Sequence, residues 1–202
     1  MAVFGSGSVG TAVALKEVTP KPGGGKMDAL AAKKVVAARA VDDDFAWARS
    51  KARNATIISF FRGRNDDLLS FEEVRKALQP TGESYVGCRS IPVKRVVGSD
   101  GRSRDFNRSF MPRGDFMRER WVRVDRAYDE CKILRPVKVL EIGGVYFVRD
   151  GNHLVSVARL HDVGYIDAEV TRLKGDVPLE PGMPMADIEE RLRAAKEPKT
   201  AA

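Results

Sequence analysis

The chain alternates between apolar and polar positions most regularly in its second half, where the pattern predicts β-strands. Alternating or short apolar runs bounded by turn residues occupy 90–97, 137–142, 145–149 and 166–173. The second and third runs are separated only by Gly143-Gly144, and a two-residue connection with positive φ angles is typical of a tight hairpin. Because this pair is antiparallel while the other strands alternate with helices, we expect a mixed sheet.

Apolar residues spaced by three and four positions predict the helices. Ser70 and Glu73 form a capping box at the start of a short helix. Another helix is expected from Asn152 to about His161, with Gly164 in its C-cap region. The clearest helix precedes the hairpin and places five residues on one face: Met117, Trp121, Val124, Tyr128 and Cys131.

The two ends of the chain differ in character from its middle. Residues 1–26 are rich in Gly, Ser, Thr and Pro, which predicts a flexible leader. Residues 27–63 are rich in Ala, Lys and Arg and are expected to be helical, with Asp42-Asp43-Asp44 capping a second helix. Near the C-terminus, Ile188 and Leu192 are in phase on one more amphipathic helix.

Together these elements predict an α+β fold, in which a small mixed sheet with packed helices follows a helical N-terminal region. A chain of 202 residues fits one domain of moderate size with extensions. We expect a flexible leader at 1–26, a helical N-terminal region at 27–82, a sheet-bearing domain at 83–175, and a C-terminal helix and tail at 176–202.

Composition narrows the classes of function. A net charge of +7 favours acidic partners such as nucleotides or DNA. We expect a cytoplasmic protein that does not enter the membrane, because the chain has only two cysteines, no secretory signal and no apolar run of spanning length. Two histidines do not favour a zinc site. The basic segment 26–64 is interpreted as a solvated helical face rather than a nucleic-acid arm, because acid and base alternate there.

The stretch 145–159 carries the strongest functional signal, because it reads as an apolar strand, a tight turn and the start of a helix. A glycine before a helix lets unpaired N–H groups and the helix dipole meet an anion, most often a phosphate. Gly151, Asn152 and His153 would supply these amides, and Asp150 and His153 are the candidate catalytic residues. The alternative is that Asp150 or Asn152 only caps the helix.

The loop 98–108 supports an anion site, because it combines glycines with arginines that can grip phosphate and aspartates that can hold Mg²⁺. Arg102 and Arg104 are its candidate phosphate ligands. From Arg89 to Arg126 there are eleven basic and five acidic residues, a balance of +6. Ordinary surface salt bridges are the alternative interpretation, and the concentration of charge favours anion binding.

In order and in residues, the region from about 90 to 173 resembles the ParB/sulfiredoxin superfamily, close to the N-terminal (ParB-like nuclease) domain of chromosome-partitioning proteins. The resemblance rests on an "IPV" strand, an arginine-bearing loop, an "L-x-P" approach to a strand, the signature turn and a final strand. In this chain these are Ile91-Pro92-Val93, 102–106, 134–139, the Asp150-Gly151-Asn152-His153 turn and 165–170.

The resemblance implies a nucleoside triphosphate, CTP or ATP, accompanied by Mg²⁺, with its phosphates at the signature turn. Carried over by position, Gly151, Asn152 and His153 would cradle phosphate, and Arg102 and Arg104 would reach it from the first loop. The resemblance also implies an association with DNA, and the helices at both ends of the chain leave a homodimer open.

Two positions depart from the family pattern. Leu154 stands where the turn of the family ends in arginine, which puts catalysis in doubt more than the fold. Asn152 stands where sulfiredoxins carry their reactive cysteine, which disfavours that reaction. Two alternatives therefore stay open beside nucleotide binding. One is a phosphotransfer enzyme or nuclease that uses the same site, and the other is an interaction scaffold whose site has decayed.

Overall fold

The computed structural model describes residues 26–62, 65–175 and 177–196. The leader expected at 1–26 lies outside the described residues except for Lys26. The chain divides into two compact units, Met1–Val36 and Ala37–Ala202, and the second contains the whole sheet. Within the described residues, none of the helices is both long and apolar enough to cross a bilayer.

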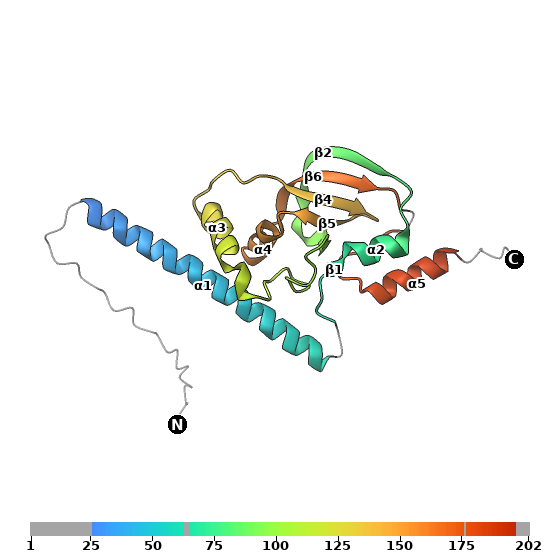
Figure 1. Cartoon of the computed structure of the whole chain (residues 1–202), viewed down its shortest axis with the longest axis horizontal. Coiled ribbons are helices and arrows are strands. Elements are labelled where there is room, and N and C mark those ends of the chain that lie inside the picture. The colour runs from blue at the N-terminus through green and yellow to red at the C-terminus, as the bar shows by residue number, and fades with distance from the viewer. Residues whose placement is uncertain (1–25, 63–64, 176, 197–202) are drawn as a thin grey trace, which may run out of the picture. The chain divides into compact units, whose positions relative to one another are not determined.

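The centre of the larger unit is a six-stranded sheet in the order β1-β3-β5-β4-β6-β2 (Figure 1). The pairs β2–β6 and β4–β5 are antiparallel, whereas β1–β3, β3–β5 and β4–β6 are parallel. The predicted α+β class with a mixed sheet is therefore confirmed. The strands are β1 (Leu69–Ser70), β2 (Glu83–Pro92), β3 (Val96–Ser99), β4 (Val137–Ile142), β5 (Val145–Asp150) and β6 (Tyr165–Leu173).

The hairpin between β4 and β5 is confirmed, with Gly143 and Gly144 at φ angles of 59° and 85°. The single strand predicted at 90–97 is wrong. β2 ends at Pro92, a 3₁₀ turn covers Val93–Arg95, and β3 begins at Val96. The break follows from topology, because β2 is an edge strand while β3 lies beyond β5, so the chain must cross the sheet between them.

The helices are α1 (Lys26–Phe61), α2 (Phe71–Leu78), α3 (Arg118–Asp129), α4 (Asn152–Leu160) and α5 (Met185–Lys196). The predicted start of a second helix at Asp42–Asp44 is wrong, because α1 runs through it. Phe45, Ala48 and Ala52 of α1 are buried against α3 and α4, and this packing holds the segment helical. Local capping signals yield to such tertiary contacts.

Two predicted helix ends need correction. Ser70 is the N-cap of α2 as predicted, but its side chain makes no capping hydrogen bond. The left-handed residue after α4 is Asp162, with a φ of 51°, rather than Gly164. The Val163 N–H donates to the Ala158 carbonyl at 2.8 Å, which closes a Schellman-type end two residues before Gly164.

Helices cover both faces of the sheet (Figure 1). On one face, Leu140 and Phe147 pack with residues of α2 and α5, among them Val74 and Ile188. On the other face, the adjacent strand residues Val139 and Val148 pack against α4 and the loop that follows β3. A third cluster joins α1, α3 and α4 around Trp121. These clusters fix α3 and α4 relative to the edge of the sheet from which the signature turn projects.

Candidate functional site

Three segments meet where the signature turn begins. β5 lies inside the sheet, between β3 and β4, and leads directly through Gly151 into α4. The loop after β3 starts beside it, because the Asp100 N–H donates to the Val148 carbonyl at 2.8 Å. β4 runs antiparallel to β5 and pairs Lys138 with Asp150, so the residues just before β4 also reach the turn. The carboxyl end of β5 is therefore the point where loop, turn and helix converge.

Gly151 has a backbone conformation that favours glycine. Its φ is 98°, and a Cβ at this position would lie 2.7 Å from Cγ1 of Val137. The Asp150 carboxylate accepts the Gly151 N–H at 2.9 Å, and no side chain caps α4. The first helical bond runs from the Val155 N–H to the Gly151 carbonyl at 3.1 Å. The N–H groups of residues 152–154 therefore have no acceptor within the helix, and these three residues line the pocket at the helix start.

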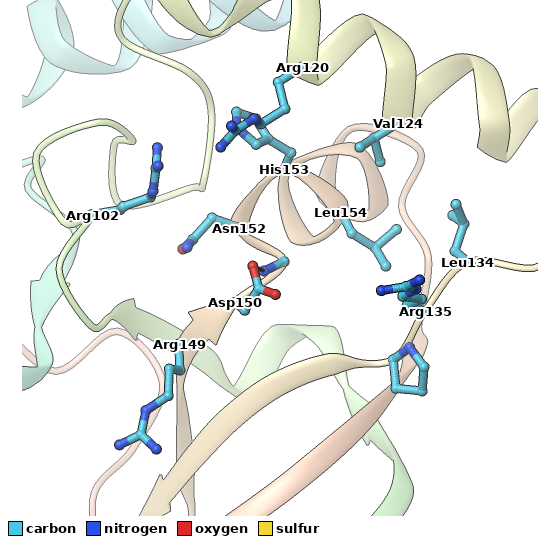
Figure 2. A pocket seen from close by; sticks show the side chains of 12 residues that line it. Arg102, Arg120, Val124, Leu134, Arg135, Arg149, Asp150, Asn152, His153 and Leu154 are labelled. Carbon is cyan, nitrogen blue, oxygen red and sulfur yellow. Dashed lines mark hydrogen bonds between the residues drawn. The ribbon is translucent and has the colours of Figure 1, made fainter.

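A pocket of about 290 Å³ lies at this helix start, and arginines from four segments border it (Figure 2). Asp150 is the only acidic residue along its described lining. Two of the arginines are paired with nearby aspartates, Arg102 with Asp105 at 3.2 Å and Arg149 with Asp100 at 3.4 Å. The four arginines are Arg102 of the loop, Arg120 of α3, Arg135 before β4 and Arg149 of β5.

Arg120 and Arg135 make no ion pair or hydrogen bond with any described residue. Both therefore present uncompensated positive charge to the pocket. Together with the α4 amides they form a site for an anion, since charged donors and a helix N-terminus act on the same volume.

Two buried side chains of α4 face the pocket with unpartnered polar atoms. Asn152 is 4% exposed, and its Oδ1 has no hydrogen-bond partner among the described residues. His153 is 8% exposed, and within the same part of the chain its Nδ1 has none. Burial, together with the smaller effects of the Arg102 and Arg120 charges and against the opposing effect of Asp105, lowers the pKa of His153 to about 4. At neutral pH His153 is therefore an uncharged imidazole that can donate or accept one hydrogen bond at each nitrogen.

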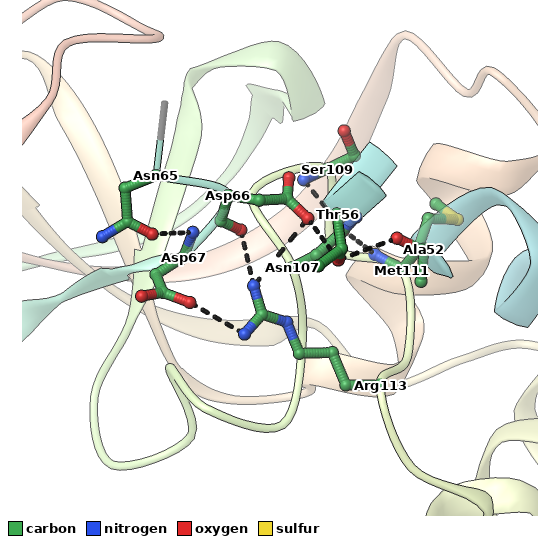
Figure 3. Close-up of polar contacts among 9 residues, drawn as sticks. All are labelled: Ala52, Thr56, Asn65, Asp66, Asp67, Asn107, Ser109, Met111 and Arg113. Carbon is green, nitrogen blue, oxygen red and sulfur yellow. Dashed lines mark hydrogen bonds and ion pairs between the residues drawn. The ribbon is translucent and has the colours of Figure 1, made fainter. Parts of the chain in front are cut away.

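A polar network outside the pocket holds the loop that carries Arg102 (Figure 3). The buried Asn107 accepts the amides of Ser109 and Met111 at 3.0 and 2.9 Å. Arg113 donates to Asp67 at 2.8 Å and to the Asp66 carbonyl at 2.8 Å. These bonds hold the second half of the loop, and the bond from the Asp100 N–H to the Val148 carbonyl holds its start.

The structure brings most of the predicted site residues together. Arg102, Asp150, Gly151, Asn152 and His153 all line the same pocket. Arg104 does not, because it lines a separate hollow beside β1 and Arg113. Arg149 and Arg159 are two further arginines that could supply the charge missing at Leu154, and only Arg149 lines the pocket.

Arg149 borders the pocket while paired with Asp100, and Arg159 points elsewhere, donating to the Val96 carbonyl at 3.0 Å. Leu154 borders the pocket and packs against the core, so it supplies no charge.

The sequence analysis missed Arg120 and Arg135. Arg135 could have been found from the register of the hairpin. Because β4 and β5 are antiparallel around Gly143-Gly144, the residues just before β4 lie beside the signature turn that follows β5. For Arg120 the signal is weaker. Its neighbour Trp121 donates its indole N–H to the Ser156 hydroxyl at 2.9 Å and so anchors α3 on α4.

Comparisons with known proteins find no matching family model, no similar curated protein and no similar solved structure. The resemblance to the ParB/sulfiredoxin superfamily therefore stays a prediction from the sequence. The geometry by itself describes a basic pocket at a helix start, bordered by buried polar side chains without partners.

Proposed function

We propose that this protein binds a nucleoside triphosphate, CTP or ATP, with its phosphates at the Asp150–His153 turn. One observation carries the proposal: the first amides of α4 and the unpaired guanidinium groups of Arg120 and Arg135 border one pocket. Arginine in this setting can make two parallel hydrogen bonds to a phosphate, and it remains charged at all relevant pH values. Arg120 and Arg135 reach the pocket from other elements of the fold, and there they supply the positive charge that Leu154 lacks.

A second hollow beside the pocket supports a ligand longer than a single phosphate. It has a volume of about 380 Å³ and shares Arg102, Arg120 and His153 with the first. The ring of Phe116 borders it and is 76% exposed. Bases stack readily on exposed aromatic rings, so this hollow suits the nucleoside while the triphosphate occupies the pocket at the turn.

A phosphotransfer or nuclease reaction at the same turn is a second candidate. The observation that favours it is the Asp150 carboxylate on the pocket wall, because Mg²⁺ is commonly held by one or two carboxylates together with phosphate oxygens. His153, with its pKa near 4, is a weak proton acceptor at neutral pH. We therefore rank binding before catalysis. An association with DNA rests on net charge and resemblance alone and remains a prediction.

Titration of the full chain with CTP and with ATP, each with and without Mg²⁺, tests the proposal. We expect Arg120→Ala and Arg135→Ala each to weaken binding by about tenfold or more, since a hydrogen bond to a charged group contributes about 1.5–3 kcal/mol. Arg126→Ala is the matched control. It removes an exposed arginine of the same helix that does not line the pocket, and its affinity should equal that of the wild type.

The outcomes separate the candidate functions. Absence of binding at millimolar nucleotide would overturn the proposal and favour the scaffold alternative. Equal losses in all three arginine variants would indicate a general charge effect rather than a site. Phosphate release that is lost in Asp150→Asn would favour the enzyme over a binding protein.

A further inference from the structure

A second group of chemically active side chains lies at the other end of α4. Asp44 of α1, Asp125 of α3 and His161 at the C-cap of α4 each place one ligand atom within 4.8 Å of the others. His161 lies eight residues after His153, which corresponds to about 12 Å along a helix. The group is therefore separate from the pocket at the signature turn, and no step of the proposed nucleotide binding uses it.

The carboxylate of Asp125 is fully buried and only half satisfied. Its Oδ1 lies 2.8 Å from Nε2 of His161, while no described residue forms a hydrogen bond with its Oδ2. A buried carboxylate oxygen without a partner is costly and calls for a proton or a cation. Among the described residues, no lysine or arginine pairs with Asp44 or Asp125. Apart from the His161 imidazole on Oδ1, the described residues therefore offer these two carboxylates no positive charge.

The ligand atoms are held by packing that does not depend on any ion. The His161 ring stacks on Tyr128 with centroids 5.0 Å apart, and Phe45 packs on Trp121 at 5.5 Å. Burial raises the pKa of Asp125 against the lowering effect of its hydrogen bond to His161, and the charges of Asp129 and Asp44 raise it further. The ligand atoms of Asp44 and Asp125 lie within 4.8 Å of each other, and a cation between them would neutralise this concentration of negative charge.

We propose that Asp44, Asp125 and His161 bind a divalent transition-metal cation of the Zn²⁺ class. The imidazole nitrogen favours zinc, and a given site with nitrogen and oxygen ligands generally binds Zn²⁺ more tightly than Mn²⁺. Ligand atoms about 2 Å from a tetrahedral ion lie about 3.3 Å apart. The three ligand atoms lie within 4.8 Å of one another, so binding would draw them closer, and Asp44 is the less buried of the two carboxylates. Three protein ligands leave the fourth position to water.

Binding would join three helices that the sequence keeps far apart. On binding, Nε2 of His161 would carry no proton, with the imidazole N–H on Nδ1, and would coordinate the metal, which would replace His161 as the partner of the Asp125 carboxylate. The ion would then cross-link the described part of α1 from Asp42 onward to α3 and α4. We infer a structural role, because the group lies outside both hollows of the proposed nucleotide site.

Titration of the metal-free full chain with Zn²⁺, Mn²⁺ and Mg²⁺, followed by calorimetry and by thermal unfolding, tests the site. We expect one Zn²⁺ per chain, a higher Tm with Zn²⁺, weaker binding of Mn²⁺ and no response to Mg²⁺. Asp44→Asn and His161→Gln should each weaken Zn²⁺ binding by at least about tenfold. Asp43→Asn, which removes an exposed carboxylate next to Asp44 that is not one of the three ligands, is the matched control and should bind Zn²⁺ as the wild type does.

The result stays interpretable if Asp125→Asn does not fold, because Asp44 is only half buried and its variant keeps the core intact. No Zn²⁺ binding by the wild type would overturn the proposal. So would full binding by both Asp44→Asn and His161→Gln. Binding that is lost in His153→Gln instead would place the ion in the pocket at the signature turn, and would also overturn it.

Discussion

Gly151→Ala is expected to lower the free energy of unfolding by about 2–4 kcal/mol and to weaken nucleotide binding at least tenfold. The new side chain must adopt a left-handed backbone conformation at φ 98°, which costs about 1 kcal/mol or more. Its Cβ would also lie 2.7 Å from Cγ1 of Val137, a side chain that is 1% exposed, and overpacking of a core typically costs about 1–3 kcal/mol. Relief of this contact would turn the α4 amides away from the pocket.

Urea unfolding and a CTP titration measure the two effects, and the chain offers graded controls. Gly101 shares the positive φ, at 85°, but an added Cβ there would meet nothing within 4 Å. Gly101→Ala should therefore show only the backbone cost. Gly164→Ala has neither problem and should be nearly neutral. A Gly151→Ala change that costs no more than Gly101→Ala would contradict the close approach to Val137.

A double-mutant cycle isolates the contact itself. In a Val137→Ala background, Cγ1 is absent, so Gly151→Ala should cost less than it does in the wild type. The difference between the two costs measures the overpacking against Cγ1, because the backbone conformation and the approach to Cβ and Cα of residue 137, at 3.1 and 3.3 Å, are common to both backgrounds. Additive costs would mean that the contact with Cγ1 contributes nothing.

The parts of the fold that could be predicted from the sequence depend on local signals. The hairpin follows from Gly143-Gly144, since two adjacent residues with positive φ restrict the choice of turn. The start of α4 follows from Gly151, and β6 from strict alternation. Each of these signals lies within about ten residues, so no knowledge of the partner strand was needed.

The errors arose where a distant contact decides the local structure. α1 continues through Asp42–Asp44 because Phe45 and the residues after it pack against Trp121, which comes much later in the chain. The strand expected at 90–97 breaks because its two halves belong to different parts of the sheet. Strand order is a property of the whole fold, and a single sequence does not contain it in readable form.

The same distinction separates the two candidate sites. The signature turn is one continuous segment, so its residues could be recognised as one candidate site from the sequence. Arg120 comes from a helix that approaches the turn only in the fold. The group of Asp44, Asp125 and His161 forms no recognisable sequence motif, because its members lie far apart in the chain and come from three different helices. The small number of histidines therefore gave no guide to metal binding.

A second large effect concerns pH, and it arises from His153. Its imidazole has a pKa of about 4 in the fold, against an ordinary value near 6.5. Between these values the unfolded chain binds a proton that the folded chain does not, so stability falls as the pH falls. The loss reaches about 2 kcal/mol at pH 5 and about 3 kcal/mol once the pH is below 4.

The measurement compares wild type and His153→Gln in urea at a series of pH values from 7.5 to 4. Titrating carboxylates are common to both proteins, so the difference between the two curves reports His153 alone. The wild type should lose stability relative to the variant as the pH falls from 6.5. The chain has only two histidines, so the imidazole resonances of His153 can be assigned with the same variant. A His153 resonance that titrates near 6.5 would contradict its burial.

The ligand gives this titration a link to the proposed function. A phosphate beside His153 favours the charged imidazole and would raise its pKa in the complex, against the burial and the arginines that lower it in the free protein. Proton uptake would then accompany binding, and CTP affinity should rise as the pH falls from 7 to 5. His153→Gln should lack that rise even if it still binds CTP. An affinity that depends on pH equally in both proteins would place the phosphates beyond the reach of His153, on the Arg135 side of the pocket.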